Sequence, residues 1–430
     1  MQTDVAPQNL AAPPEARPVG VRTVLRYLIG GRDAIEAIAA SRRALWIGLL
    51  FVLSAGLARE YDQHYLIREP AYLLIPLLAS LIASFALFLL IRLAVGRQSA
   101  PPGFWRAYRS FLTLFWMTAP LAWLYAIPFE RWLSAYDATR ANLWTLGLVA
   151  AWRVALMTRV VSVFAHMHAA ASFFVVMFFA NVAAVAGIMF SPVPLPAVMG
   201  GVHYSEAETL LALVTFSIAS LSVITIPILG LGALVAALRR TPKRGWSALA
   251  ACNSAHVQPK LRALAIAAVL VWLTVLPFTQ PEQRLRWRVE SLFRAGDIHA
   301  ALAEMSVRPR SAFPPHWQPP GRYGFERHGP DLFTAADALA DTPTADWVRG
   351  LYLQRLRECA RDWHFWHFGN DDIPRLANVL ARLPEGPDIA REIREELEER
   401  LTHTNQEPGR YRAALEAMLA LADSQVTTPP

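Results

Sequence analysis

Arg153 is the residue of this chain whose position most suggests chemistry. It lies near the middle of a mainly apolar stretch, residues 141–165, and a charged side chain inside a membrane segment is costly and marks a functional site by default. We expect this stretch to form a hairpin with the next one, turning near Met167, so that Asn181 reaches the same depth and accepts a hydrogen bond from the guanidinium. The functional interpretation is a site for an anion or a lipid phosphate. The alternatives are a structural hydrogen bond between helices, or an interfacial helix that never reaches the midplane.

Other polar residues near this hairpin have simpler interpretations. Arg159 lies nearer the end of the same stretch, so its long side chain is expected to reach the headgroups. His166 and His168 lie at the turn. On a helix, two side chains two residues apart face different directions. The two histidines are therefore better interpreted as polar residues at headgroup level than as a metal-binding or pH-sensing pair.

A second group of candidate ligands lies in the last third of the chain. Cys359, His364 and His367 are residue types that bind zinc, and a three-residue histidine spacing can place both rings on one helix face. The spacing matches no standard zinc site, and the aromatic residues between them indicate core packing as the alternative. We find no nucleophile elbow, zinc-protease helix or phosphate-binding glycine loop. The sequence therefore predicts no enzyme and no cofactor.

Long apolar stretches must position these side chains. The chain is 54% hydrophobic and only 17% charged, against about 25% charged in ordinary soluble domains. A bilayer core about 30 Å thick needs roughly 20 apolar residues in a helix. Ala44–Ala58 is shorter than this and can span only if Arg43 and Arg59 extend to the headgroups. We expect about seven membrane helices in residues 44–280: Ala44–Ala58, Ala71–Ile91, Ser110–Phe129, residues 141–165, Ala169–Phe190, Thr209–Leu238 and Ala263–Thr279.

The arginines and lysines predict an orientation for these helices. Basic residues gather on alternate connections: six before Ala44, four between residues 92 and 109, and six between residues 239 and 262. The other connections carry only Arg59, Arg68, Arg131 and Arg140. Because positive loops stay in the cytoplasm, we expect a bacterial cytoplasmic membrane protein with a cytoplasmic N-terminus and an extracytoplasmic C-terminal domain. The positive charge suits anionic lipid headgroups and argues against a nucleic acid partner.

Several local signals predict where helices begin and break. Residues 1–43 are expected to hold a disordered tail without a signal peptide, followed by a short basic amphipathic helix, Val21–Ile29. Two pairs fit a capping box at a helix start: Asp33 with Glu36, for a helix expected to run straight into the membrane, and Ser205 with Glu208. Pro120 is expected to kink the third membrane helix, and Pro227, Gly230 and Gly232 to break the sixth.

Residues 281–430 differ in composition from the rest of the chain. They carry 19 arginines and 23 acidic residues, a net charge of −4, whereas the remainder carries +11. Their length suits one soluble domain, and no alternating β-branched pattern occurs. We expect an all-α domain with these helices: Glu282–Ala295, Ile298–Met305, Asp331–Ala340, Ala345–Trp363, Asp372–Leu383, Asp388–Leu401 and Arg410–Ala422.

Two short stretches resemble known families. Residues 292–309, with Gly296 at a turn and Ala300 or Ala301 packed in the second helix, resemble the middle of one tetratricopeptide repeat. That resemblance implies a helical hairpin and a protein-binding role. Residues 31–70, which include RRALWIGLLFVLSAGLAREYD, resemble a group of uncharacterised bacterial polytopic membrane proteins. This second resemblance implies no activity.

Three functional hypotheses follow from the sequence. The first is a non-enzymatic scaffold or assembly factor in the lipid bilayer that presents residues 281–430 to a protein partner. The second is a transporter or channel that uses Arg153 and the broken helix Thr209–Leu238. The third, an intramembrane enzyme, has no supporting motif.

Overall fold

The chain is helical throughout the part that the structure, a computed structural model, describes: residues 18–61, 64–95, 103–189, 206–239, 256–314, 317–323, 331–362, 365–366, 372–403 and 409–424. These residues contain no β-strand, only one isolated parallel bridge between Val19 and Val257. The predicted all-α fold is confirmed. The chain divides into two compact units, and each is described by itself.

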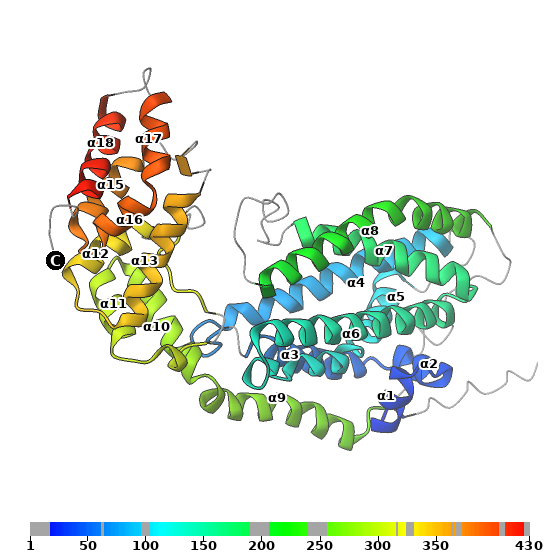
Figure 1. Cartoon of the computed structure of the whole chain (residues 1–430). Helices are drawn as coiled ribbons and strands as arrows, with labels where there is room; N and C mark the ends of the chain where they lie inside the picture. The colour runs from blue at the N-terminus through cyan, green and yellow to red at the C-terminus, as the bar shows by residue number, and fades with distance from the viewer. Residues whose placement is uncertain are drawn as a thin grey trace, which may run out of the picture. The chain divides into compact units, whose positions relative to one another are not determined.

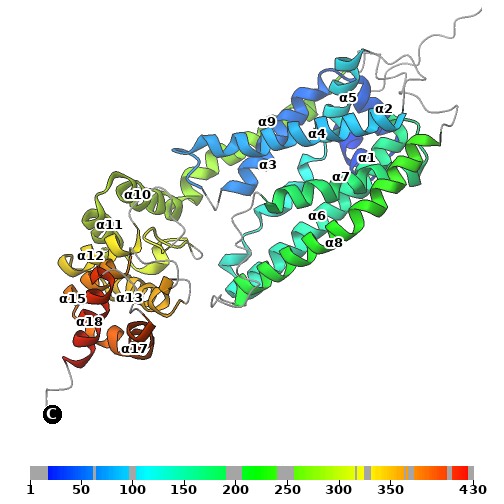
Figure 2. The same cartoon turned by 90° about the horizontal axis from the view of Figure 1, so that it is seen from above.

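The first unit holds the apolar helices, and α4, α6, α7 and α8 run close to one direction in both views (Figures 1 and 2). Six helices of the described chain are long and apolar enough to cross a membrane, and a seventh crossing is added if the bent pair α2–α3 forms one span. The elements are α1 (Val21–Leu28), α2 (Arg32–Ala40), α3 (Ala44–Glu60), η1 (Pro70–Leu73), α4 (Leu74–Val95), α5 (Phe104–Trp116), η2 (Ala119–Ala126), η3 (Phe129–Arg131), α6 (Ala135–Phe164), α7 (Ala169–Met189), α8 (Glu206–Leu238) and α9 (Pro259–Thr279).

Many large apolar side chains on the outside of this unit are exposed, among them Ile82 (69%), Ile224 (67%) and Leu231 (63%). Water would penalise such surface, whereas hydrocarbon would not. Together with the six apolar helices, this indicates a membrane protein.

The helix starting near Asp33 does not run straight into the membrane, as the sequence predicted. It begins at Arg32 with Gly31 as its N-cap and no side-chain cap, and Glu36 pairs with Arg32 at 2.9 Å instead of closing a capping box. It ends at Ala40, and the chain bends by 105° into α3. Most of α2 is buried because its alanine and isoleucine side chains pack inside the unit. The second predicted capping box pairs Ser205 with Glu208. Ser205 and the Glu208 side chain lie outside the described residues, and α8 begins at Glu206.

The predicted break in the sixth apolar helix is wrong, because α8 is continuous through Pro227, Gly230 and Gly232. The two glycines serve helix packing instead. A Cβ on Gly230 would lie 3.2 Å from the Phe178 ring, and one on Gly232 would lie 2.3 Å from the Phe174 ring, both on α7. Pro120 was expected to kink a continuing helix, but the α-helix stops before it: α5 ends at Trp116, and the chain continues as the 3₁₀ helix η2.

Gly232→Ala should therefore destabilise the apolar unit. The added methyl group overlaps the Phe174 ring, and overpacking of this kind costs about 1–3 kcal/mol. We expect a lower thermal unfolding midpoint for the detergent-purified protein. Gly187→Ala on α7 is the matched control, because nothing lies within 4 Å of its Cβ position. Equal midpoints for the two variants would contradict this packing role.

The second unit contains the remaining helices: α10 (Pro281–Ala295), α11 (Ile298–Ser306), η6 (Arg310–Ala312), α12 (Leu332–Asp341), α13 (Asp346–Arg361), α15 (Ile373–Arg382), α16 (Gly386–Glu392), α17 (Arg394–His403) and α18 (Gly409–Asp423). Its own core includes Phe293, Leu302, Tyr352 and Leu380. Gly296, at φ +82°, ends α10 in the left-handed region and joins it to α11. The two helices pack against each other, and Ala301 is fully buried.

Candidate functional site

A cavity of about 410 Å³ lies within the first unit. Its wall is formed by five segments, α3, α4, the α5–η2 region, α6 and α7. On α4 the lining residues follow helical spacing: Pro76, Ala79, Ser80, Ala83 and Leu87. Small side chains on this face leave the space open, and the volume lies in the range typical of ligand sites.

Arg153 of α6 lines this cavity and is its most unusual group. The side chain is half-buried, and its guanidinium carbon lies 5.4 Å from the centroid of the Phe115 ring. Within the described parts of the chain, no carboxylate and no hydrogen-bond acceptor contacts the guanidinium. A cation–π contact satisfies none of its N–H donors, so these donors remain available to a ligand.

The neighbouring hydroxyl and indole groups of the wall already have internal partners. The Ser80 hydroxyl donates to the Leu77 carbonyl at 2.7 Å and accepts from the Trp116 indole at 3.1 Å. The Thr118 hydroxyl donates to the Phe115 carbonyl at 2.8 Å. These groups therefore contribute little free polar character to the cavity.

Two further polar side chains of the wall belong with Arg153. Tyr125 of η2 lies within electrostatic range of both Arg153 and Arg59. Arg59, near the end of α3, has a side chain that is 63% exposed and lies 3.5 Å from a Glu60 oxygen. The cavity therefore combines one guanidinium inside the unit, a phenol hydroxyl, and a second guanidinium that reaches its surface.

The hydrogen bond predicted between Arg153 and Asn181 is absent. The hairpin itself is present: α6 ends at Phe164, α7 begins at Ala169, and His166 makes the turn at φ +48°. The Asn181 carbonyl oxygen instead accepts from the Thr225 hydroxyl of α8 at 3.1 Å, and its amide donates to the Met177 carbonyl at 2.9 Å. Asn181 thus joins α7 to α8 and leaves Arg153 without the partner that sequence reasoning gave it.

Arg159 lies apart from the cavity, as its expected position near the helix end implied. Its side chain is exposed and donates to the Gly30 carbonyl at 3.4 Å. Two turns of α6 further from the end, the Trp152 indole donates to the Leu28 carbonyl at 2.8 Å. These two bonds attach the loop after α1 to α6.

The predicted metal ligands form no site among the residues that can be described. No group of three or more His, Cys, Asp or Glu there could hold a metal ion. Cys359 is buried, and burial, together with nearby Asp362 and Asp372, raises the pKa of its thiol. A raised pKa disfavours the thiolate that zinc requires. His364 and His367 lie outside the described residues.

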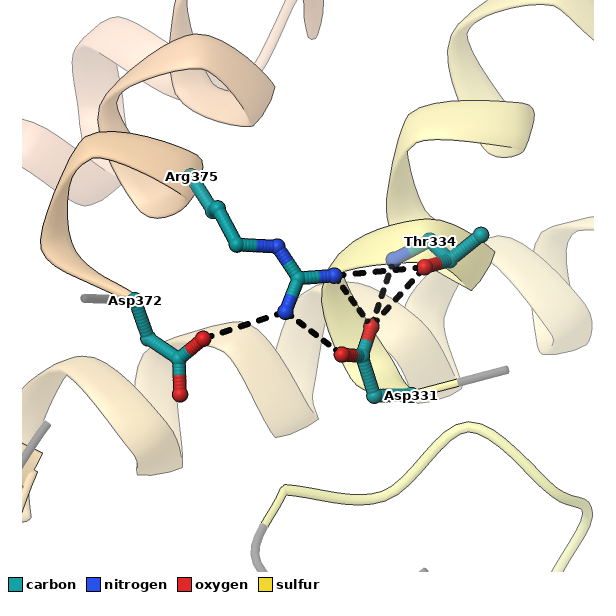
Figure 3. Close-up of polar contacts among 4 residues, drawn as sticks. All are labelled: Asp331, Thr334, Asp372 and Arg375. Atoms are coloured by element: carbon teal, nitrogen blue, oxygen red, sulfur yellow. Dashed lines mark hydrogen bonds and ion pairs between the residues drawn. The ribbon is translucent and has the colours of Figure 1, made fainter. Parts of the chain in front are cut away.

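The densest polar cluster of the second unit joins α12 to α15 (Figure 3). Both terminal nitrogens of Arg375 donate hydrogen bonds to the Asp331 carboxylate, at 2.6 and 2.8 Å. One of these nitrogens also donates to the Asp372 carboxylate at 3.0 Å. Asp331 is also the N-cap of α12 and accepts from the Thr334 amide at 3.0 Å. Burial alone would raise the pKa of Asp331, but the hydrogen bonds from Arg375 and Thr334 outweigh it and lower that pKa. Every group is paired, so the cluster has a structural role.

Arg375→Ala should loosen α12 in the full-length protein. Removing a bidentate but half-exposed partner is expected to cost about 1 kcal/mol, seen as faster hydrogen exchange of the α12 amides. A carboxylate with a lowered pKa stabilises the fold above its unfolded pKa and loses that effect as the pH falls through the folded pKa. The difference from wild type should therefore shrink below about pH 4. Arg412→Ala, which breaks one exposed pair with Glu416, is the control, and an equal effect there would refute the role of the cluster.

Sequence reasoning missed the cavity itself and the participation of Tyr125. The signal that could have indicated the wall is the spacing of small residues in the second apolar stretch, at positions 79, 80 and 83. No pattern in a single sequence could join them to Arg153, which is 70 positions further along the chain than Ala83.

Comparison of the chain with family models, with curated proteins and with solved structures found no match. The candidate function therefore depends on the geometry of the site alone.

Proposed function

We propose that this chain is a multi-pass membrane protein that binds an anion in the cavity around Arg153, as a transporter or carrier would. The observation that carries the proposal is a guanidinium without an acceptor in the described chain, facing a 410 Å³ cavity whose other polar groups are mostly bonded internally. A cation held in apolar surroundings is costly to bury unless an opposite charge joins it.

The chemistry of the site favours a carboxylate or phosphate group. A guanidinium presents its donors in a planar fork that matches two oxygens of such an anion. Attraction between charges is also stronger in a poorly solvated cavity than in water. The Tyr125 hydroxyl, within electrostatic range of Arg153, supplies a further donor.

The isolated bridge between Val19 and Val257 supports a seven-crossing topology. The Val19 amide donates to the His256 carbonyl at 2.8 Å, and the Gln258 amide donates to the Val19 carbonyl at 2.9 Å. Residues that pair in this way lie on one side of a membrane, so an even number of crossings must separate them. Five of the six candidate spans lie between them. The bent pair α2–α3 then has to supply the sixth, which means that Ala44–Glu60 crosses.

Contacts at the other end of the unit support the same topology. Leu57, Tyr61, Leu66 and Leu276 form one small cluster, which joins the end of α3, the start of the next helix and the end of α9. In the proposed topology, the helix ends that flank the arginine-rich connections, Val95, Phe104, Leu238 and Pro259, belong to the opposite end. Under the positive-inside rule, the proposed orientation has a cytoplasmic N-terminus and an extracytoplasmic C-terminal unit.

The scaffold hypothesis concerns the second unit. Residues 278–430 make up most of a separate compact unit with its own core, which is compatible with presentation to a protein partner. A specific observation, the guanidinium facing a cavity, supports anion binding by the first unit, and anion binding is therefore the stronger proposal.

The test is binding of butyl phosphate to the full-length protein in phosphatidylcholine nanodiscs. We expect saturable binding, and we expect Arg153→Leu to lower the affinity for butyl phosphate at least about tenfold. A tenfold loss of affinity corresponds to about 1.4 kcal/mol, which one charge-assisted contact can supply. Arg159→Leu removes an exposed arginine of the same helix and should bind like wild type. Equal binding by wild type and Arg153→Leu would refute the proposal.

A further inference from the structure

We infer that the anion bound beside Arg153 carries a hydrocarbon chain, so that the ligand is a single-chain anionic amphiphile; this inference rests on the proposed anion site. A small inorganic anion would fill only the region around the guanidinium. The remaining wall has to be matched by the rest of the ligand.

That remaining wall is apolar. It is lined by Val52, Ala55, Val154, Met157, Val176 and Phe179, in addition to the small residues of α4. The Ser80 and Thr118 hydroxyls and the Trp116 indole are bonded within the protein. An apolar cavity of this kind excludes water and accepts apolar groups, and each methylene taken from water into it favours binding.

The cavity also extends along α4. Its lining residues on α4 extend from Pro76 to Leu87, about three helical turns. A chain fits such a shape better than a compact ring system or an inorganic ion does.

The polar groups suggest how the ligand lies and enters. Arg153 and Tyr125 would hold the headgroup, and the apolar wall of α3 and α4 would hold the chain. Arg59 is 63% exposed at the end of α3 and lies within electrostatic range of Tyr125. It is therefore placed to attract the anionic headgroup at the entrance, before the headgroup reaches Arg153. Positive charges along a cleft steer anionic ligands in this way.

The experiment compares dodecyl phosphate with butyl phosphate on the full-length protein in phosphatidylcholine nanodiscs, with empty nanodiscs subtracted. We expect dodecyl phosphate to bind at least tenfold more tightly, and Arg153→Leu to weaken both. Val52→Phe places a ring in the part of the apolar wall on α3 that would hold the chain, and should weaken dodecyl phosphate while leaving butyl phosphate unchanged. Ala83→Leu fills the wall from α4 and serves as a second, independent variant.

The outcomes separate the two proposals. Arg153-dependent binding of butyl phosphate with no gain from the longer chain, and no effect of either filling variant, would overturn the amphiphile while leaving the anion site intact. Binding of both probes that does not depend on Arg153 would overturn the anion site and the amphiphile together.

Discussion

Leucine in place of Arg153 is expected to raise the thermal unfolding midpoint of the purified protein while it removes affinity for butyl phosphate. An arginine at the centre of a membrane helix costs about 2.5–3.5 kcal/mol on insertion scales. The contact with the Phe115 ring, 5.4 Å away, returns about 0.5–2 kcal/mol. Because no acceptor in the described chain contacts the guanidinium, leucine should give a net gain of about 0.5–3 kcal/mol, a shift of a few degrees.

The direction in which the thermal unfolding midpoint changes distinguishes a binding role of Arg153 from a structural role. A buried charged residue that serves to bind a ligand destabilises the protein when no ligand is bound, so its replacement stabilises the empty protein. Replacement of a residue that holds helices together destabilises the protein instead. Arg159→Leu, which loses only one long hydrogen bond to Gly30, should leave the midpoint nearly unchanged. A clear fall in the midpoint of Arg153→Leu would mean that the guanidinium has a structural role.

Reporter fusions should give an all-or-none result on the orientation of the membrane helices. Alkaline phosphatase, which folds only outside the cytoplasm, is expected to be active when fused behind Thr279 and inactive when fused behind Leu238. A fluorescent protein should show the reverse. In the proposed orientation the arginine-rich connections hold one end of the bundle in the cytoplasm, and α9, a candidate span, lies between the two fusion points.

A third fusion behind Glu60 tests the bent pair α2–α3 directly. The proposed topology, which the bridge between Val19 and Val257 supports, has α3 crossing, so phosphatase should be active at this point too. Its controls are a tandem fluorescent fusion and an immunoblot showing equal amounts of each fusion. An inactive phosphatase behind both Glu60 and Thr279 would invert the proposed orientation.

The helices were largely predictable because local chemistry decides their ends. Uncharged runs of membrane length predicted α7 and α8 to within a few residues, and the predicted starts of α9 and α10, Ala263 and Glu282, lie four residues and one residue after the observed ones. In the second unit, Gly296 indicated the turn between α10 and α11, and its φ of +82° is the conformation that glycine adopts most easily. These signals depend on neighbours within one or two helical turns.

The site was less predictable because its geometry depends on residues far apart in sequence. Asn181 has the right depth to meet Arg153, but the Thr225 hydroxyl of a third helix is its partner. Glycines such as Gly230 and Gly232 are typical of a helix break. Here they instead make room for the rings of Phe178 and Phe174. In both cases the packing of α8 against α7 decides the role, and one sequence does not state which helices are neighbours.

The bend between α2 and α3 illustrates the same limit. Nothing at Ser41, Arg42 or Arg43 is an obligatory helix breaker, so a continuous helix was the natural expectation. The 105° bend lets α2 bury its alanines and isoleucines inside the unit. That burial is a tertiary effect which overrides local propensity.

Photo-crosslinking tests the central claim, an anion-binding cavity inside the membrane unit, most directly. Dodecyl phosphate carrying a diazirine would be added to the wild-type protein in phosphatidylcholine nanodiscs, illuminated, and the labelled peptides identified by mass spectrometry. We predict labels on the lining segments of α3, α4 and α6, lost with excess butyl phosphate and in Arg153→Leu. Labels confined to the lipid-facing surfaces of α8 and α9, and unchanged by competitor or by the substitution, would contradict it.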